Sequence, residues 1–283
     1  MRIGTRGSAL ALAQATPVAQ ALGGELVVIT TAGDRDRSAG DKGRWVGALE
    51  RALLEGEIDI AIHSAKDVPG RLAEGTALLP SPPRADARDA LCGAPSLDAL
   101  PEGARVGTAS LRREAQLRAL RPDLEIAELR GNVDTRLRRL AEEDFAAIVL
   151  AAAGLLRLGR GAEGTPMDEL VPAAGQGVLA LQARAGEHAD ITGDEAATRA
   201  LACERALVTA LDADCDTPVG AHATVLPTGD LHLRAFVGRP DGTAWLTDDL
   251  EGSDPLMVGA DVAERLFASG AGDILESVRR AEH

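Results

Sequence analysis

Short apolar runs alternate with stretches of helical spacing along the first two thirds of the chain. The runs "RIGT", "ELVVIT" and "IDIAIHS" are typical of strands, and "RWVGALERALLEG" places its apolar residues three or four positions apart. The same alternation resumes after the proline-rich "PSPPRADARDA", with strands predicted at "ARVGTA", "EIAELR" and "FAAIVLAAAG". Strands that alternate with helices predict βαβ units and mostly parallel sheets. The chain therefore begins with two α/β units of similar size.

The last third of the chain has a different pattern. Residues 194–212 predict a long amphipathic helix, which is followed by three runs of alternating apolar and polar residues. The turn signals "TGD" and "RPDG" separate these runs, and a final helix is predicted over 255–270. We expect this part to be a small α+β domain with an antiparallel sheet.

The charge balance narrows the possible partners. The 283 residues have a net charge of −14, so nucleic acid and anionic membranes are poor partners for the molecule as a whole. Two tryptophans, three phenylalanines and no tyrosine make base stacking an improbable mode of action. Apart from Lys42 and Lys66, every basic residue is an arginine, the residue type suited to bidentate capture of carboxylate or phosphate. An acidic protein that binds anions must gather its arginines locally.

The cysteines and the N-terminus indicate a reduced, cytoplasmic setting. Cys92, Cys203 and Cys215 are an odd number with wide spacing, which fits neither a disulfide framework nor a metal pattern. The N-terminal stretch lacks the apolar core of a signal peptide, and no apolar run has the length of a transmembrane helix. The histidines show no ligand spacing, so we predict no metal site.

Polar clusters follow several predicted strands. Ligands of open α/β sheets bind beyond the carboxyl ends of the strands, and helix N-termini there supply free N–H groups. All of these clusters are suited to anion binding. Their members are Arg6 and Ser8 in "TRGS", His63, Ser64, Lys66 and Asp67 in "HSAKDVP", Thr108, Ser110, Arg112 and Arg113 in "GTASLRR", and Arg130 and Arg136 in "LRGNVDTRLRR".

Each cluster also has a structural interpretation. Ser8 and Ser110 have the residue type and position of plain helix caps, and His63 near a strand end is more often a hydrogen-bonded structural histidine than a base. Cys92 and Cys203 lie among apolar neighbours, as small core residues do. Cys215 lies between Asp214 and Asp216, whose charges disfavour a reactive thiolate, so its role stays open at this level. Solvated helix faces are the expected place of Arg118, Arg138 and Arg139.

Six motifs in order resemble those of the porphobilinogen deaminase (hydroxymethylbilane synthase) family. They are "RIGTRGSALALAQA", "DIAIHSAKDVP", "GTASLRR", "LRGNVDTRL", "PAAGQGVLALQAR" and "CDTPVGAHA", and together they extend over nearly the whole chain. The resemblance implies two α/β lobes like those of periplasmic binding proteins, followed by the small C-terminal α+β domain. The implied boundaries are 1–84 with 175–195 for lobe 1, 85–174 for lobe 2 and 196–283 for the C-terminal domain.

The resemblance also implies a reaction. The family condenses porphobilinogen head to tail with release of ammonia to give the linear tetrapyrrole hydroxymethylbilane, in porphyrin and heme biosynthesis. Its dipyrromethane cofactor, built from substrate, is joined by a thioether to a loop cysteine, which corresponds to Cys215. Such a thiol reacts once with an electrophilic methylene pyrrole and then remains an anchor. A depressed thiol pKa is therefore unnecessary.

Residue roles follow from the same motifs. Asp67 corresponds to the catalytic aspartate, whose charge would stabilise the cationic azafulvene left by loss of ammonia. Cofactor-side positions are Lys66, Thr108, Ser110, Arg112, Arg113 and Arg136. Positions for the incoming substrate or growing chain are Arg6, Ser8, Ser64, Arg130 and Arg157.

Two points qualify the resemblance. Gly47 stands where the family often has lysine, so the loop around 34–46 is expected to close less firmly. A non-catalytic bilobal protein that binds small anions would also explain the lobes and the arginines, although it leaves Cys215 and the C-terminal domain unexplained. The resemblance also implies a monomer, with no obligate protein partner evident, although nothing in the sequence excludes a dimer.

Overall fold

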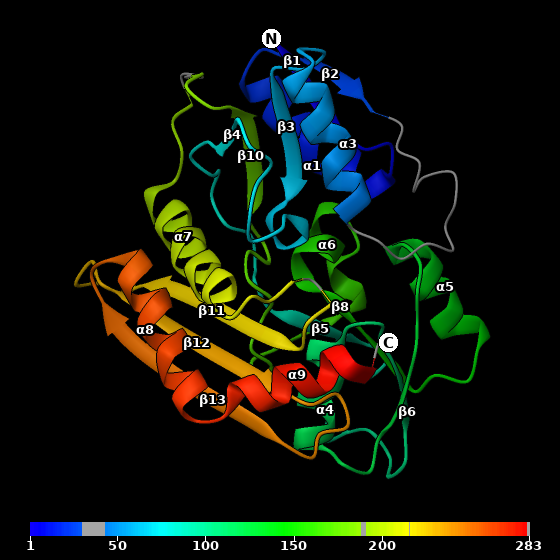
Figure 1. Cartoon of the computed structure of the whole chain (residues 1–283). Helices are drawn as coiled ribbons and strands as arrows, with labels where there is room; N and C mark the ends of the chain where they lie inside the picture. The colour runs from blue at the N-terminus through cyan, green and yellow to red at the C-terminus, as the bar shows by residue number, and fades with distance from the viewer. Residues whose placement is uncertain (30–42, 188–190, 215, 282–283) are drawn as a thin grey trace.

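The computed structural model of the chain describes residues 1–29, 43–187, 191–214 and 216–281. These residues form two five-stranded sheets and one three-stranded sheet, with helices packed on their faces. Lobe 1 lies at the top of Figure 1, lobe 2 at the lower right and the C-terminal domain at the lower left. The loop expected at 34–46 falls largely outside the described residues, and Gly47 lies in helix α3 (Gly43–Leu54).

The sheet of lobe 1 has the strand order β2-β1-β3-β10-β4. β1 is parallel to β2 and β3, whereas β10 is antiparallel to both β3 and β4. α1 (Ala9–Ala21) and α3 cover the sheet and bury Ile3 and Leu181 fully, as is typical of the mainly apolar strands of a covered sheet. The strands are β1 (Arg2–Thr5), β2 (Glu25–Val28), β3 (Ile60–Ser64), β4 (Thr76–Leu78) and β10 (Leu179–Arg184).

The sheet of lobe 2 repeats this topology, with the order β7-β6-β8-β5-β9. β6 is parallel to β7 and β8, and β5 is antiparallel to both β8 and β9. In each lobe, the antiparallel strand comes from the segment that crosses over from the other lobe. The strands are β5 (Asp89–Cys92), β6 (Arg105–Gly107), β7 (Glu125–Ala127), β8 (Ala147–Ala151) and β9 (Thr165–Met167), and the helices are α4 (Leu111–Leu120), α5 (Val133–Glu142) and α6 (Ala152–Arg157).

The two crossing segments lie against each other between the lobes. The Ala85 N–H donates to the Gly177 carbonyl at 3.1 Å. Gly177 has φ +87°, and a Cβ there would lie 2.4 Å from the Ala85 carbonyl oxygen, so only glycine fits. The fully buried Glu204 carboxylate joins the C-terminal domain to this crossing, since it accepts from Arg84 Nη1 at 2.6 Å and from the Gly175 N–H at 2.6 Å.

The C-terminal domain packs helices on a three-stranded antiparallel sheet. Leu207, Leu233 and Val262 are fully buried in its core. α7 and α8 approach closely at Gly259, where a Cβ would lie 2.5 Å from the Cys203 carbonyl oxygen. The elements are α7 (Glu195–Ala210), β11 (Val219–Val225), β12 (Leu231–Gly238), β13 (Trp245–Gly252), α8 (Pro255–Ala268) and α9 (Ala271–Ala281).

The structure confirms the predicted fold class and corrects some elements. The three-residue strands β4 and β9 show no periodicity that could be recognised. The proline-rich stretch 80–90 is predicted to be a crossover, but its last two residues already belong to β5. The final predicted helix ends at Ala268, because Gly270 has φ +103° and the chain then begins α9. The exact boundaries of the lobes stay a prediction.

In the described part of the chain, no helix is long and apolar enough to cross a membrane.

Candidate active site

The predicted anion-binding residues follow the carboxyl ends of strands in both lobes. Arg6 follows β1, and the short 3-10 helix η1 (Ala65–Asp67), which carries Lys66, follows β3. In lobe 2, Thr108 follows β6 and Arg157 ends α6, the helix that directly follows β8. The sheet topology therefore directs the residues of each lobe to one edge of its sheet.

The turn that carries Asp67 is packed against the start of β10. The Ala65 N–H donates to the Val178 carbonyl at 3.0 Å. Gly175 lies so close that a Cβ there would be 2.8 Å from the Ala65 Cβ. Lys66 Nζ donates to Gln176 Oε1 at 3.3 Å, and both Lys66 and Asp67 are partly exposed. The turn is thus held by its backbone while its charged side chains keep access to solvent.

His63 lies behind this turn as a buried neutral side chain. It is 6% exposed, and burial lowers its pKa to about 4 against the smaller opposing effect of Glu50. Asp67 and Arg6 are close enough to shift this pKa in opposite directions. A histidine that resists protonation in this way is suited to a structural role.

Arg112 and Arg113 form a buried cluster around Asp89. The two arginines are 4% and 5% exposed, and Asp89 is fully buried. Arg112 Nη1 donates to Asp89 Oδ2 at 2.7 Å and to the Val171 carbonyl at 2.6 Å. Arg113 Nη2 donates to Asp89 Oδ1 at 2.8 Å, and its Nη1 donates to the Val149 carbonyl at 2.9 Å.

This arrangement fixes Asp89 as a charged group. Burial alone would raise the pKa of its carboxyl, but Arg112, Arg113 and a hydrogen bond from Gln176 outweigh that effect and hold the pKa below its usual range. One carboxylate therefore balances two buried guanidinium groups and leaves a net positive charge. Each guanidinium has five N–H donors, so donors remain on both arginines for a further acceptor.

Gln176 connects the two lobes through its side-chain amide. Its Nε2 donates to Asp89 Oδ1 at 2.8 Å and to the Ala87 carbonyl at 2.7 Å, while its Oε1 accepts from Lys66. A continuous hydrogen-bonded path therefore leads from Lys66 to Arg112 and Arg113. Sequence reasoning missed Asp89 and Gln176, although a charged residue at the start of a buried strand and the polar residue in "PAAGQG" were both available as signals.

Two further arginines lie on the lobe 2 side. Arg136 Nε donates to the Gly131 carbonyl at 2.7 Å, and burial, together with the charges of Arg113 and Arg130, lowers the Arg136 pKa to about 10. Arg130 is exposed and forms an ion pair with Glu128 at 2.5 Å. A cation crowded by other cations is stabilised by an anionic ligand. The donor set here therefore fits a group that carries carboxylates.

The remaining predicted residues have local partners. Ser8 caps α1, since its Oγ accepts from the Ala11 N–H at 3.2 Å. Ser110 precedes α4 without a side-chain capping bond, and its N–H donates to Thr108 Oγ1 at 3.2 Å. Arg157 Nη2 donates to the Gly177 carbonyl at 2.7 Å. Arg6 and Ser64 are both partly exposed.

Cys215 lies outside the described residues, but the turn around it is described. The Asp214 carboxylate accepts from Thr217 Oγ1 at 2.7 Å and from the Asp216 N–H at 3.0 Å. Cys92 and Cys203 are fully buried, and burial raises their thiol pKa to about 11 and about 12. Neither buried thiol is suited to nucleophilic chemistry, as expected for small core residues.

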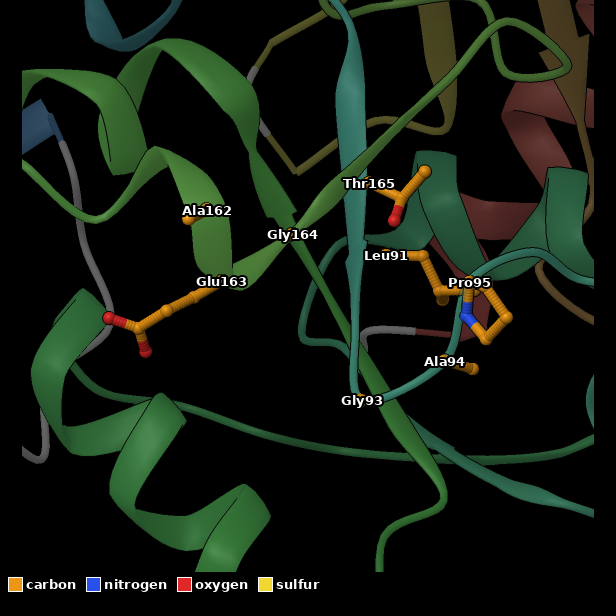
Figure 2. Close-up of a pocket in the computed structure, with 8 residues that line it drawn as sticks. All are labelled: Leu91, Gly93, Ala94, Pro95, Ala162, Glu163, Gly164 and Thr165. Atoms are coloured by element: carbon orange, nitrogen blue, oxygen red, sulfur yellow. The ribbon is translucent and has the colours of Figure 1, made fainter.

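A cavity of about 260 Å³ lies elsewhere, at the far end of the lobe 2 sheet. Figure 2 shows Leu91, Pro95 and Thr165 on one side of it and Glu163 pointing away from them. The register pairs Asp89 with the last residue of β8, so the end of β5 next to the cavity points away from the arginine cluster. This cavity is not part of the candidate site.

The fold and the site define a class of protein. It has two α/β lobes of the same topology, an arginine-rich site at the strand ends, and a third domain whose sequence contains Cys215. Family models match both parts of the chain: "Porphobilinogen deaminase, dipyromethane cofactor binding domain" matches residues 1–192, and "Porphobilinogen deaminase, C-terminal domain" matches residues 198–268.

Individual relatives agree over nearly their full length. A porphobilinogen deaminase of Brevibacillus brevis is 43% identical over 99% of this chain and 97% of its own, and one of Roseiflexus sp. is 46% identical over 96% and 97%. The solved Bordetella pertussis BvgS periplasmic VFT2 domain covers 66% of this chain and 81% of its own at 16% identity, with a TM-score of 0.35, too low to support a conclusion.

The chain belongs to the porphobilinogen deaminase family, the enzymes that condense porphobilinogen into hydroxymethylbilane in tetrapyrrole biosynthesis. Its cofactor is the dipyrromethane named by the family model for residues 1–192. A non-catalytic binder of small anions is not favoured, because the match extends over the C-terminal domain as well as the lobes.

Proposed function

We propose that Asp67 is the catalytic residue with which this chain joins porphobilinogen units head to tail and releases ammonia at each step. The observation that carries this proposal is the position of Asp67 in a backbone-anchored turn whose neighbour Lys66 is hydrogen-bonded, through Gln176, to the arginine cluster. Loss of ammonia leaves positive charge on the pyrrole of the substrate. A fixed carboxylate stabilises this charge only as it develops, which lowers the barrier without tightening substrate binding.

The cofactor is proposed to be anchored at Cys215 and held by the side chains nearest the arginine cluster. When bound, the dipyrromethane supplies the pyrrole carbon to which the first porphobilinogen is joined. Arg136, with its pKa lowered by burial and by neighbouring cations, is suited to bind one of the cofactor carboxylates. The proposed contacts are Lys66, Thr108, Ser110, Arg112, Arg113 and Arg136.

The incoming substrate and the growing chain are proposed to lie along the outer residues of the site. Porphobilinogen carries an acetate and a propionate, so each added unit brings two more carboxylates. Forked guanidinium donors bind such groups bidentately, and serine hydroxyls complete the hydrogen bonds. The proposed residues are Arg6, Ser8, Ser64, Arg130 and Arg157.

We also infer that the enzyme works in the cytoplasm as a monomer without an obligate protein partner. The free, buried thiols of Cys92 and Cys203 support a reducing compartment. The substrate is a small molecule, and the proposed site uses side chains of one chain.

The anchoring of the cofactor can be tested by intact mass. Purified protein is expected to exceed its sequence mass by one dipyrromethane, with the addition on the peptide that contains Cys215, and to give colour with Ehrlich's reagent. The Cys215→Ser protein is expected to lack both signals and to be inactive, whereas a Cys203→Ser protein serves as the matched control. An unmodified wild type with full activity would refute the assignment.

A further inference from the structure

Arg205 extends from the C-terminal domain to the segment that directly follows Asp67. It lies on α7, ten residues before Cys215. Its Nη1 donates to the Val68 carbonyl at 3.3 Å, and its Nη2 donates to the carbonyls of Pro69 and Gly70, each at 2.8 Å. One guanidinium group therefore binds three consecutive carbonyls of lobe 1.

These carbonyls depend on Arg205 for their hydrogen bonds. Within the described residues, no backbone N–H donates to the carbonyls of Val68, Pro69 or Gly70. Besides Arg205, the Thr209 hydroxyl approaches the Gly70 carbonyl at 3.5 Å. A Cβ at Gly70 would lie 3.1 Å from Thr209 Oγ1, so the segment runs close against α7. The carbonyls are thus oriented by α7 and not by their own lobe.

Among the described residues, the Arg205 guanidinium contacts backbone carbonyls and no carboxylate. In the part of the chain that the structure describes, no carboxylate lies within ion-pair distance of Arg205, and burial lowers its pKa. The arginines on the surface of lobe 2 differ, since Arg138 and Arg139 each bind a glutamate four residues away. Arg205 is held by carbonyls alone, which suits a residue that fixes backbone geometry.

We propose that Arg205 is a positioning residue that fixes the Asp67 turn relative to the domain carrying Cys215. α7 ends at Ala210, five residues before Cys215, so the helix that binds the backbone after Asp67 also directly precedes the proposed cofactor anchor. This inference rests on the proposed role of Asp67.

The test uses full-length holoenzyme with Arg205→Ala. Because a misplacement of about 1 Å can reduce a rate on the order of 10²-fold, kcat is expected to fall by roughly that factor while KM changes little. Cofactor content by intact mass is expected to be unchanged. Amide hydrogen exchange in the peptide spanning 65–72 is expected to accelerate, and added guanidinium at a non-denaturing concentration is expected to restore part of kcat.

Arg199→Ala is the matched control. Arg199 also lies on α7 and also binds two carbonyls, those of Gly229 and Ser253 at 2.8 Å each, but both belong to the C-terminal domain. This variant is expected to keep its kcat, to show no guanidinium rescue and to leave exchange at 65–72 unchanged. Equal losses of kcat in the two variants would overturn the proposal.

A second variant covers the case in which Arg205→Ala does not fold. Arg205→Lys keeps the charge, but its single ammonium group cannot span all three carbonyls, so we expect an intermediate kcat and no guanidinium rescue. Normal kcat with unchanged exchange at 65–72 would refute the positioning role.

Asp67→Asn is measured in parallel to separate the two proposals. Normal turnover of Asp67→Asn would refute the role of Asp67. An inactive Asp67→Asn together with a fully active Arg205→Lys would refute only the role of Arg205.

Discussion

In lobe 1 the last residues of β3 are His63 and Ser64, and in lobe 2 the last residues of β8 are Leu150 and Ala151. The registers make these pairs equivalent, because Ser64 is opposite Leu179 on β10, and Ala151 is opposite Asp89 on β5. Each lobe thus places one buried polar residue near the same corner of its sheet, but on different strands. Lobe 1 has it on the parallel strand, and lobe 2 on the antiparallel one.

The difference follows from what each corner must support. In lobe 2, Asp89 forms ion pairs with Arg112 and Arg113 of α4, so its charge balances two arginines that we propose bind the carboxylates of the cofactor. In lobe 1, the polar residue His63 stays neutral behind the turn that carries Asp67, so the charge lies on the turn and not in the sheet. We propose that the same strand order supports anion binding in lobe 2 and catalysis in lobe 1.

The largest effect, a loss of stability, is expected from removing the charge of Asp89 in lobe 2. Asp89→Asn keeps the shape of the side chain but leaves two guanidinium groups buried without a carboxylate. Removing one member of a buried ion pair typically destabilises a protein by about 3–5 kcal/mol, so the free energy of unfolding at pH 7 is expected to fall by that amount. Denaturant unfolding monitored by circular dichroism measures it, and the variant is also expected to assemble little cofactor.

The pH dependence of this effect has a defined sign. The pKa of Asp89 is depressed in the folded protein, so its contribution to stability is complete above its unfolded pKa of about 4 and is lost as the pH falls toward the folded value. The difference in the free energy of unfolding between wild type and Asp89→Asn should therefore be the same at pH 7 and pH 5.

Glu142→Gln is the control for Asp89→Asn, because the exposed ion pair of Glu142 with Arg138 contributes less than about 1 kcal/mol to stability. A loss as small as that of the control would mean that Asp89 does not balance the arginines.

The next effect concerns the charge in lobe 1. Asp67→Asn removes the negative charge at nearly constant shape, and the loss of one such electrostatic group typically lowers kcat on the order of 10²–10³-fold. Asp67→Glu keeps the charge and moves it by one methylene, so it is expected to retain measurable turnover. Porphobilinogen consumption measures both variants, with circular dichroism as the folding control. Asp67→Asn that turns over like wild type would remove Asp67 from the mechanism.

The sequence was most informative where periodicity or motif order carried the signal. Alternating strands and helices predicted the two α/β units, and the long helix with its three alternating runs predicted the C-terminal domain. Arg112 and Arg113 were predicted, but their partner Asp89 was not, because β5 is short and begins within a proline-rich stretch. The contacts of Arg205 and Gln176 join residues far apart in the chain, and no local pattern indicates which carbonyl or carboxylate such a side chain will meet.

The smallest expected effect tests whether His63 has a structural role. Burial lowers the His63 pKa to about 4, below its unfolded value of about 6.5. Between these two values the unfolded chain binds more protons, so His63 makes the folded protein less stable as the pH falls, by up to about 1.4 kcal/mol per pH unit. His63→Gln removes this titration, so the free energy of unfolding should depend less steeply on pH in the variant than in wild type.

A second histidine, the partly buried His222, provides the internal control for this measurement. His222 also has its pKa lowered to about 4 by burial, and because it is present in both proteins its contribution cancels in the difference. Parallel stability curves between pH 4 and pH 6.5 would show that His63 does not titrate as a buried group. The pH profile of kcat separates structure from chemistry, since a structural His63 leaves the shape of that profile unchanged in His63→Gln. If His63→Gln instead removed the fall of kcat on the acidic or the basic side of the profile, His63 would be a proton-transfer group. The sheet of lobe 1 would then contribute a catalytic residue, in addition to the one proposed in its turn.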